Sequence, residues 1–576
     1  MGDNENRKVY KARQVKNYRE MVEYSCKNYA QNIAYKYKKD YTAKNIEYIE
    51  KKYEQVGKDI KAFGTGLLNL DLMGERIVVV GKNRYEWCIS YLATTCSNMV
   101  IVPIDKALPD IEMQRLIERS EAKAIIFDEK YLETIKKVQE KENSNLKTLI
   151  CMDNIQEKGI KTFNEILEEG RNQIKNGDQK YDNIEIDENK MSIMLFTSGT
   201  TNEPKAVMLS QANICANISN IACWVKLYPT DVLLSFLPIH HTFECTITFL
   251  YGFYSGSQVA FCDGLKHIQQ NLKEYKVSVF VAVPLVLETM YKKIQKAIEE
   301  QGKTGLINKM TKISNTLLKA KIDIRKIVFK QILDNFGGNL RVVLYGAAPM
   351  NKATIIGYNN LGISLVQGYG LTETSPVVTA ETDKEKRPGS IGLALANLNL
   401  KIANPDNEGV GEITVKGPSV MLGYYKNPEE TKKVLKDGWF STGDYGYKDK
   451  DGFVYITGRK KDIIVLKNGK NVYPQEIEFL INKIPYIAES LVYSRDKDTT
   501  DTMLCAKIVY DKDTIKQMIG EKTEEEYKEI IWQEIKKINQ ELPIFKKIKN
   551  ITITTEPLKK TTTQKVKRYE ELKNLT

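Results

Sequence analysis

Short apolar runs alternate with longer amphipathic stretches over about the first 450 residues of the chain. Five of these runs are rich in β-branched residues and are bounded by glycine, proline or charged residues: RIVVV (76–80), AKAIIF (122–127), VLLSFL (232–237), SVFVAV (278–283) and LRVVLY (340–345). Short runs of this composition are typical of strands in a buried parallel sheet. The stretches between them are long enough for helices, so the pattern predicts βαβ units and an α/β fold.

The hydrophobic pattern changes near residue 400. In KIANPDNEGVGEITVKG (401–417) and KDKDGFVYITG (448–458), apolar and polar residues alternate around the turns DNEG and DKDG, which predicts β-hairpins. The remaining segment contains three strand candidates, at 489–494, 503–510 and 550–554, and a long charged helix at about 523–541. We therefore predict a large N-terminal domain of βαβ-type sheets with a small β-rich subdomain near 400–457, followed by a small α+β domain.

The segment FTSGTTNEPK (196–205) follows a hydrophobic run and combines hydroxyls, a glycine and a lysine: Thr197, Ser198, Gly199, Thr200, Thr201 and Lys205. A glycine lets backbone N–H groups turn toward an anion, the hydroxyls donate hydrogen bonds, and the lysine adds positive charge. These groups suit a polyphosphate. The segment differs from the GxxxxGK[ST] phosphate loop, which the chain lacks. An ordinary polar surface loop is the alternative.

Four further segments have a similar mixture of small, aromatic and polar residues: LPIHHTFE (237–244), LYGAAPM (344–350), VQGYGLTET (366–374), and GWFSTGDYGY (438–447) with GRKKD (458–462) after it. Ligands of open α/β sheets bind beyond the carboxyl ends of the strands. We therefore expect the first three of these segments to lie at such an edge together with 196–205.

Several side chains in these segments suit a nucleotide. Tyr369 offers an aromatic face for a base, beside the small residues Gly346 and Ala347. Asp444 could accept hydrogen bonds from both hydroxyls of a ribose, and Glu373 suits a Mg²⁺ ion that bridges phosphate oxygens. Each residue also has a structural alternative: a core position for the tyrosine, a turn cap for the aspartate and a helix start for the glutamate.

Composition limits the class of protein. The 576 residues are too many for one hydrophobic core, and 42% apolar and 28% charged residues are ordinary for a soluble globular protein. No window approaches the roughly 20 apolar residues of a membrane span, and the polar N-terminus lacks the apolar segment of a secretory signal. Nine scattered cysteines without a CxxC pair indicate reduced thiols in the cytoplasm. Three histidines make a histidine-built metal site a poor prediction.

The net charge of +12 is distributed over lysine-rich helices, and the final 36 residues carry nine Lys or Arg against four Glu. Solvated helix faces explain most of this charge. The C-terminal surplus could also serve an acidic ligand or an anionic membrane surface. No motif that reads DNA or RNA accompanies the charge, so we expect no nucleic-acid partner.

With these motifs in this order, the chain resembles the adenylate-forming superfamily of acyl-CoA synthetases, peptide-synthetase adenylation domains and luciferases, from about residue 20 to 570. LPIHHTFE, VPIDKALPDIEM (102–113) and LKNGKNVYPQEIE (466–478) are most similar to bacterial AMP-forming long-chain fatty acyl-CoA synthetases. The resemblance implies two half-reactions. A fatty acid carboxylate attacks the α-phosphate of MgATP, which gives an acyl-adenylate and pyrophosphate. The thiol of coenzyme A then attacks the acyl carbonyl and releases AMP.

The resemblance also implies roles for individual residues. The β- and γ-phosphates would be held by Thr197, Ser198, Gly199, Thr200, Thr201 and Lys205, the adenine by Gly346, Ala347, Gln367, Gly368, Tyr369 and Gly370, and the ribose by Asp444 and Arg459. Glu373 would bind Mg²⁺ and Thr372 would act at the reacting phosphate. His241 would gate the junction of acyl chain, phosphate and thiol, with His240 as a packing neighbour.

Lys565, in EPLKKTTTQKVKR (556–568), matches the family's adenylation lysine, which bridges the substrate carboxylate and the α-phosphate. A lysine in a basic tail is otherwise an ordinary solvated charge. So close to the end of the chain, this lysine reaches the site only if the small domain closes over the large one.

The resemblance implies that this closure alternates with a second orientation. The hinge would be Lys461, in a segment 458–462 that joins a large domain at 1–457 to a small domain at 463–576. The second orientation would bring Gly469 to the channel for coenzyme A. Domain alternation of this kind lets one site perform two reactions.

Three positions depart from the family's pattern. Gln564 replaces the glycine before the adenylation lysine, Asn202 replaces a glycine of the phosphate-binding segment, and Cys245 stands where some relatives carry a tryptophan that gates the fatty-acid tunnel. The gate and the preferred chain length therefore do not follow from the resemblance.

Two other functions stay open on the sequence. One is acyl transfer to the phosphopantetheine of a carrier protein, and the other is a non-catalytic sensor that binds nucleotide or acyl ligand. A cytoplasmic enzyme with fatty acid and coenzyme A as substrates is the main prediction. A homodimer and weak peripheral contact with the inner membrane surface are further expectations.

Overall fold

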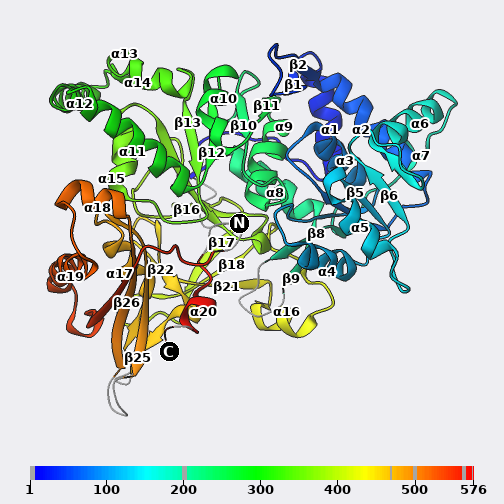
Figure 1. Ribbon diagram of the computed structural model, residues 1–576. Helices are drawn as coiled ribbons and strands as arrows, with labels where there is room; N and C mark the ends of the chain where they lie inside the picture. Colours follow the sequence, from blue (N-terminus) through cyan, green and yellow to red (C-terminus); the bar gives the residue numbers. More distant parts are fainter. Residues whose placement is uncertain are drawn as a thin grey trace. The chain divides into compact units, whose positions relative to one another are not determined.

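The computed structural model describes residues 7–197, 204–466, 470–496, 502–560, 566–573 and 575 (Figure 1). The chain forms two compact units, which we call unit 1 (residues 1–400 and 415–440) and unit 2 (residues 401–414 and 441–576). In the described parts of the chain, no helix has the length and apolar character that crossing a membrane requires.

The first sheet of unit 1 has nine strands in the order β16-β15-β14-β13-β12-β10-β11-β1-β2. The strands are β1 (Ile33–Lys38), β2 (Tyr48–Lys52), β10 (Val232–Ser235), β11 (Gln258–Phe261), β12 (Val279–Ala282), β13 (Val342–Tyr345), β14 (Ser364–Gly370), β15 (Val377–Ala380) and β16 (Leu393–Ala394). The central strands from β14 to β1 run parallel, and antiparallel strands close both edges. The strands predicted at 232–237, 278–283 and 340–345 are confirmed as β10, β12 and β13.

The second sheet of unit 1 has eight strands in the order β19-β9-β8-β4-β3-β5-β6-β7. They are β3 (Arg76–Val80), β4 (Val100–Pro103), β5 (Ala124–Phe127), β6 (Thr148–Cys151), β7 (Ile160–Thr162), β8 (Met191–Thr197), β9 (Lys205–Ser210) and β19 (Gly423–Tyr424). Strands β4, β3, β5, β6, β7 and β8 are parallel to their neighbours in this row, whereas β9 and β19 are added antiparallel. The strands predicted at 76–80 and 122–127 are β3 and β5.

Helices pack on these sheets, as the βαβ pattern predicted. The longer ones are α1 (Tyr18–Asn28), α2 (Tyr53–Leu68), α3 (Tyr85–Cys96), α4 (Asp110–Ser120), α5 (Leu132–Gln139), α6 (Phe163–Lys175), α8 (Gln211–Ala222), α11 (Pro284–Glu300), α12 (Thr304–Lys319) and α15 (Lys352–Asn360). A Cβ atom at Gly170 of α6 would lie 1.8 Å from the carbonyl oxygen of Ala62 in α2. Only glycine therefore allows these two helices to approach so closely.

Both predicted hairpins are present in a five-stranded sheet of short strands. Its members are β17 (Asn399–Ala403), β18 (Gly411–Lys416), β20 (Leu435–Lys436), β21 (Trp439–Lys448) and β22 (Val454–Arg459). Strands β17 and β18 flank the DNEG turn, and β21 pairs antiparallel with β22 around the DKDG turn.

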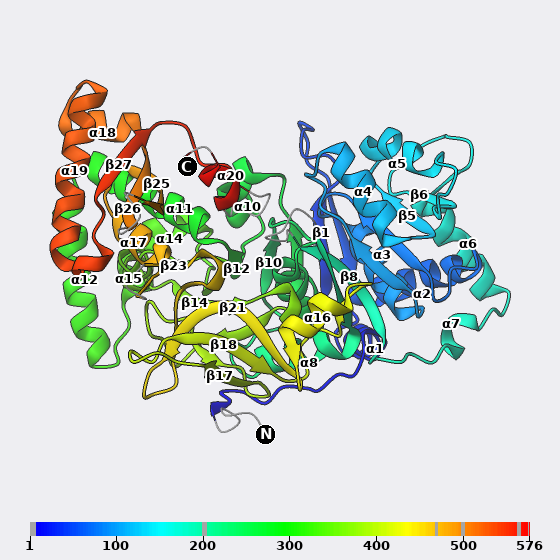
Figure 2. The ribbon, with the colours of Figure 1, turned by 90° about the horizontal axis from the view of Figure 1, so that it is seen from below.

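The C-terminal part of unit 2 is a three-stranded sheet with helices on both faces (Figure 2). The strands are β25 (Ile487–Asp496), β26 (Thr502–Tyr510) and β27 (Asn550–Thr554), and the helices are α17 (Pro474–Ile481), α18 (Lys512–Ile519), α19 (Glu524–Glu541) and α20 (Arg568–Leu572). Leu504, Ala506 and Ile508 of β26 share one core with α17 and α19. Val509, on the other face of β26, packs with Leu572 of α20. The mixed α/β class with a smaller α+β C-terminal part agrees with the prediction.

All nine cysteines are free thiols. Seven are buried, and only Cys26 and Cys262 are partly exposed. Burial raises the pKa of Cys26 to about 12 and that of Cys262 to about 11.

Candidate active site

Neighbouring strands β13 and β14 bring together the residues predicted to frame an adenine. Tyr345 pairs with Gln367 across these strands, and its hydroxyl donates to Gln367 Oε1 at 2.9 Å. A Cβ atom at Gly346 would lie 2.7 Å from the carbonyl oxygen of Gly368, so a larger residue does not fit at this point. Ala347 follows with φ of +72°, and Tyr369 and Gly370 end β14 one strand away. The small residues and the aromatic ring therefore lie at one edge of the parallel sheet.

Glu373, the predicted Mg²⁺ ligand, lies in a 3₁₀ turn (Thr372–Thr374) just after β14. Strand β19 and the residues just before it contact Glu373 at two points. The Met421 N–H donates to the carbonyl oxygen of Glu373 at 2.9 Å, and the Tyr424 hydroxyl donates to Glu373 Oε1 at 3.0 Å. The sequence motifs gave no sign of this contact.

Lys205, the predicted phosphate ligand, is the first residue of β9 and pairs with Thr197 of β8. Its ammonium lies 5.0 Å from the centre of the Tyr424 ring and 2.6 Å from Glu430 Oε2, on helix α16 (Pro428–Val434). This contact is the main reason that the pKa of Glu430 is lowered to about 2. Ser198, Gly199, Thr200 and Thr201, together with Asn202, lie outside the described residues.

His241 follows the carboxyl end of β10. Its N–H donates to the carbonyl oxygen of Pro238 at 3.0 Å, and its carbonyl accepts from Cys245 N–H at 2.9 Å. Residues Glu244–Tyr251 then form a π-helix, a rare element that is frequent at functional sites. The His240 side chain is 15% exposed, with Nε2 3.7 Å from Asp105 Oδ2, and desolvation lowers its pKa. This placement agrees with a packing role for His240.

Glu244 is a fully buried acid that the sequence motifs did not single out. Its two carboxylate oxygens accept hydrogen bonds from Ser235 Oγ at 2.7 Å and Thr248 Oγ1 at 2.9 Å. Burial is the main cause that raises its pKa to about 8. Asn83 joins this network, since its Nδ2 donates to Ser235 Oγ at 2.8 Å and to the carbonyl oxygen of Leu237 at 2.7 Å. The only sign of this buried acid in the sequence was an acidic residue at the start of an apolar run.

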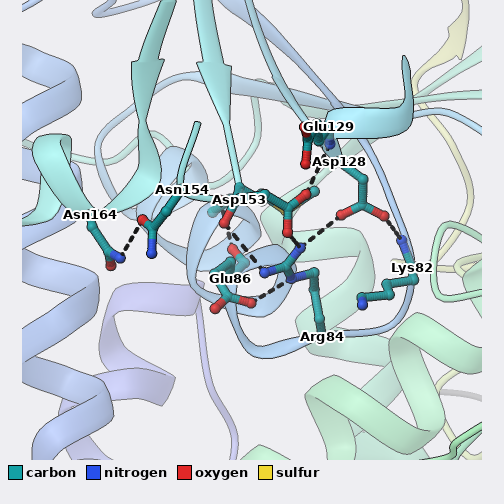
Figure 3. Close-up of polar contacts among 10 residues, drawn as sticks. Lys82, Arg84, Glu86, Asp128, Glu129, Asp153, Asn154 and Asn164 are labelled. Carbon is teal, nitrogen blue, oxygen red and sulfur yellow. Dashed lines mark hydrogen bonds and ion pairs between the residues drawn. The ribbon is translucent and has the colours of Figure 1, made fainter. Parts of the chain in front are cut away.

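The loop that carries Asn83 is anchored by Arg84, as Figure 3 shows. Arg84 lies within ion-pair distance of Glu86 at 2.6 Å, Asp128 at 3.1 Å and Asp153 at 2.6 Å. Asp128 in turn accepts from the Lys82 N–H at 2.7 Å. The guanidinium thus ties together the carboxyl ends of β3, β5 and β6.

Unit 2 holds the residues predicted for the ribose. Asp444 of β21 and Arg459 of β22 are paired across the hairpin, with Arg459 Nε 2.7 Å from Asp444 Oδ1. Asp444 is 3% exposed. Lys461, the predicted hinge, lies in the next 3₁₀ turn, Lys460–Asp462. Gly469, Gln564 and Lys565 lie outside the described residues.

The residues present fit a magnesium ion that a nucleotide helps to bind. Among the described residues, no group of three or more His, Cys, Asp and Glu side chains is arranged to hold a metal ion. Mg²⁺ usually takes one or two carboxylates and completes its shell with phosphate oxygens and water. A single carboxylate at Glu373, near Lys205, suits that mode of binding.

Two family models cover most of the chain. The model of the AMP-binding enzyme family matches residues 22–425, and that of the AMP-binding enzyme C-terminal domain matches residues 461–575. The chain belongs to the AMP-binding enzyme family. Its predicted place in the adenylate-forming acyl-CoA synthetase superfamily is confirmed.

Curated relatives match over most of their length. Long-chain-fatty-acid–CoA ligase 6 of Mus musculus is 30% identical over 497 residues, which are 80% of this chain and 70% of the relative. Long-chain-fatty-acid–CoA ligase FadD15 of Mycobacterium bovis is 29% identical over 454 residues, 76% of this chain and 74% of the relative. The chloroplastic long-chain-fatty-acid–[acyl-carrier-protein] ligase AEE15 of Arabidopsis thaliana is 28% identical over 563 residues, 85% and 76% of the two chains.

Solved structures share the fold. ATP-bound MatB from Rhodopseudomonas palustris has a TM-score of 0.74 at 23% identity and covers 96% of this chain and 98% of its own. A Mycobacterium tuberculosis fatty acyl CoA synthetase has a TM-score of 0.65 at 20% identity, with 97% and 98% covered. At this identity the likeness concerns the fold alone.

Proposed function

We propose that this enzyme activates a long-chain fatty acid with ATP and then transfers the acyl group to coenzyme A. The observation that carries the proposal is the approach of Lys205 and Glu373 to the same side chain, Tyr424. A phosphate-binding cation and a metal-binding carboxylate therefore contact the same tyrosine, which suits a Mg²⁺-bound polyphosphate. Family membership supports the reaction class, and the names of the curated relatives support the acyl substrate.

In the first half-reaction, the fatty acid carboxylate displaces pyrophosphate from the α-phosphate of ATP. Lys205 contributes charge to the phosphates, while Tyr369 and the small residues Gly346 and Ala347 accept the adenine. Glu373 would hold Mg²⁺, which neutralises phosphate charge when bound. Thr372 donates to the reacting phosphate. Catalysis of this type depends mainly on positioning and charge stabilisation.

Unit 2 supplies the remaining groups in this proposal. Asp444 and Arg459 hold the ribose, and Lys565 stabilises the charge that builds between the carboxylate and the α-phosphate. Rotation at Lys461 then removes Lys565 and brings Gly469 to the coenzyme A channel. His241 controls the junction at which the thiol meets the acyl carbonyl.

The test is pyrophosphate release with MgATP over carboxylates from acetate to oleate, with and without coenzyme A. We expect release to be greatest with long chains and AMP turnover to depend on coenzyme A. No release with any carboxylate would refute the proposal and would favour a nucleotide- or acyl-binding sensor.

Transfer to a carrier protein is a second candidate, because one relative is named as an acyl-carrier-protein ligase. Both acceptors present the same phosphopantetheine arm. A direct comparison of coenzyme A with a phosphopantetheinylated carrier protein separates them. Turnover with the carrier and none with coenzyme A would establish this alternative.

We also propose that the enzyme makes peripheral contact with an anionic membrane. Residues 284–333 support this contact. This segment carries eleven Lys or Arg against four acidic residues, which is more than half of the net charge of +12. Among the described residues, only Lys296, Arg325 and Lys330 of these cations pair with a carboxylate. The remaining lysines are available to lipid phosphates.

The same segment exposes large aliphatic side chains: Leu285, Leu306, Ile313, Leu318, Ile322 and Ile327, from 37% to 78% exposed. Leu306 and Ile313 lie seven residues apart on one face of α12. Apolar side chains beside lysines are typical of helices that lie in a membrane interface. Fatty acids partition into the same interface, so a membrane is the partner that this chemistry favours.

Co-sedimentation tests this contact with vesicles of phosphatidylcholine, with or without phosphatidylglycerol. We expect binding only with the anionic lipid, weakened by salt and by Leu306→Ser with Ile313→Ser. Leu265→Ser, at a 71% exposed leucine elsewhere, is the control. Binding that ignores anionic lipid, or that the control weakens equally, would contradict the assignment.

A further inference from the structure

Tyr424 lies between the two charged groups of the proposed nucleotide site. Its ring centre is 5.0 Å from the Lys205 ammonium, and its hydroxyl donates to Glu373 Oε1 at 3.0 Å. A lysine over an aromatic face is attracted by the ring's negative quadrupole. One side chain therefore contacts the phosphate-binding cation with its face and the metal-binding anion with its tip.

Strand pairing fixes this arrangement. β19 pairs antiparallel with β9, with Tyr424 opposite Val207. Lys205 is two residues from Val207 and on the same face of the sheet, which makes it the diagonal neighbour of Tyr424. The backbone of Tyr424 is fixed as well, since its N–H donates to Thr431 Oγ1 at 2.9 Å.

The Tyr424 hydroxyl is the donor of the hydrogen bond to Glu373. The tyrosine is 5% exposed, and its hydroxyl lies 3.0 Å from Glu373 Oε1. A carboxylate oxygen only accepts, so the hydroxyl keeps its proton and donates a hydrogen bond to Glu373. Side chains that hydrogen-bond a metal-ligating carboxylate orient it, and their loss typically lowers metal affinity about 10- to 100-fold.

We propose that Tyr424 is a positioning residue that presets Glu373 for Mg²⁺ and fixes the spacing between this carboxylate and Lys205. Glu373 keeps one oxygen on the tyrosine and presents the other to the metal. The inference rests on the proposed function, since it takes Glu373 as the magnesium ligand.

The test compares Tyr424→Phe with the matched control Tyr425→Phe. The Tyr425 hydroxyl also donates to a carboxylate at 3.0 Å, but to Glu121, away from the proposed site. In Tyr424→Phe we expect the Mg²⁺ concentration for half-maximal pyrophosphate release to rise about tenfold. KM for ATP at saturating Mg²⁺ should change little because the ring remains under Lys205. A merely structural residue would change both constants or lower the melting temperature instead.

Glu373→Gln separates failure of this inference from failure of the proposed function. If Glu373→Gln leaves the Mg²⁺ requirement unchanged, the metal assignment is wrong and the inference is overturned with it. If Glu373→Gln raises the requirement but Tyr424→Phe does not, the inference alone is wrong. In the double variant, the tyrosine substitution should add nothing, because the hydroxyl acts through the carboxylate. An additive rise would overturn the positioning role.

Discussion

Glu430 occupies the position beside Lys205 at which we expect a nucleotide phosphate to bind. Removing the charge of Glu430 should therefore strengthen the binding of ATP. The carboxylate oxygen lies 2.6 Å from the Lys205 ammonium, and the side chains are 27% and 21% exposed. With a pKa lowered to about 2, Glu430 is charged at every pH at which the enzyme can be assayed. The substitution Glu430→Gln keeps the size of the side chain and removes only the charge.

Two contributions determine the expected gain in the free energy of ATP binding. Displacing a carboxylate from a partly exposed lysine costs about 0.5–1 kcal/mol. A phosphate oxygen that replaces it would lie about 5 Å from Glu430, where each pair of like charges repels by about 0.8 kcal/mol in water. Together these amount to about 1.5 kcal/mol, or about a tenfold lower KM for ATP. Inhibition by pyrophosphate should strengthen by a similar factor.

The assay is the initial rate of adenylation as a function of ATP and of pyrophosphate. Glu429→Gln is the control, because this neighbour on α16 is 78% exposed and its side chain lies 3.5 Å from Lys432 instead. Combining Glu430→Gln with Lys205→Ala should abolish the gain. Weaker ATP binding in Glu430→Gln, or a gain that survives the loss of Lys205, would refute the reasoning.

Three further predictions concern other groups. Lys565→Ala should nearly abolish adenylate formation but leave thiolation of supplied acyl-adenylate largely intact; equal loss of both half-reactions would contradict its role. Asp444→Ala should raise KM for ATP about tenfold or more, since two hydrogen bonds from the ribose to a carboxylate are lost; unchanged ATP dependence would exclude the ribose assignment. The raised pKa of Glu244, about 8, means that the folded state binds its proton more tightly than the unfolded state. The contribution of Glu244 to stability should therefore be greatest below about pH 4.5 and fall by about 1 kcal/mol per pH unit as the pH rises from about 4.5 to about 8. Melting curves of Glu244→Gln should lack that fall, and an unchanged pH dependence would contradict it.

The hydrophobic pattern predicted individual strands well, because a strand that is buried on both faces is a nearly continuous run of apolar residues. RIVVV at 76–80 became β3 and LRVVLY at 340–345 contains β13. The pattern could not predict which strands pair. β1 (Ile33–Lys38) lies parallel to β11 (Gln258–Phe261), more than 200 residues away in the chain. Such pairing depends on tertiary packing, which short-range patterns do not encode.

The same limit applies to the site. Residues of the recognised segments, such as Lys205 and Glu373, could be named from the sequence because their chemistry is visible in it. Tyr424 and Glu430 could not, since they approach Lys205 only through the pairing of β19 with β9. Neither has an unusual local sequence, so only the fold identifies them as neighbours.

Because its thiols are buried, the native protein should react very slowly with cysteine reagents. Even the two partly exposed thiols, Cys26 and Cys262, have raised pKa values of about 12 and 11, so at neutral pH their reactive thiolate is at least about a hundredfold scarcer than that of an exposed cysteine. A new thiol at an exposed position, such as Val465→Cys at a 65% exposed site, would react first. A fluorescent label there would test the proposed rotation about Lys461 during turnover while all nine native cysteines remain in place.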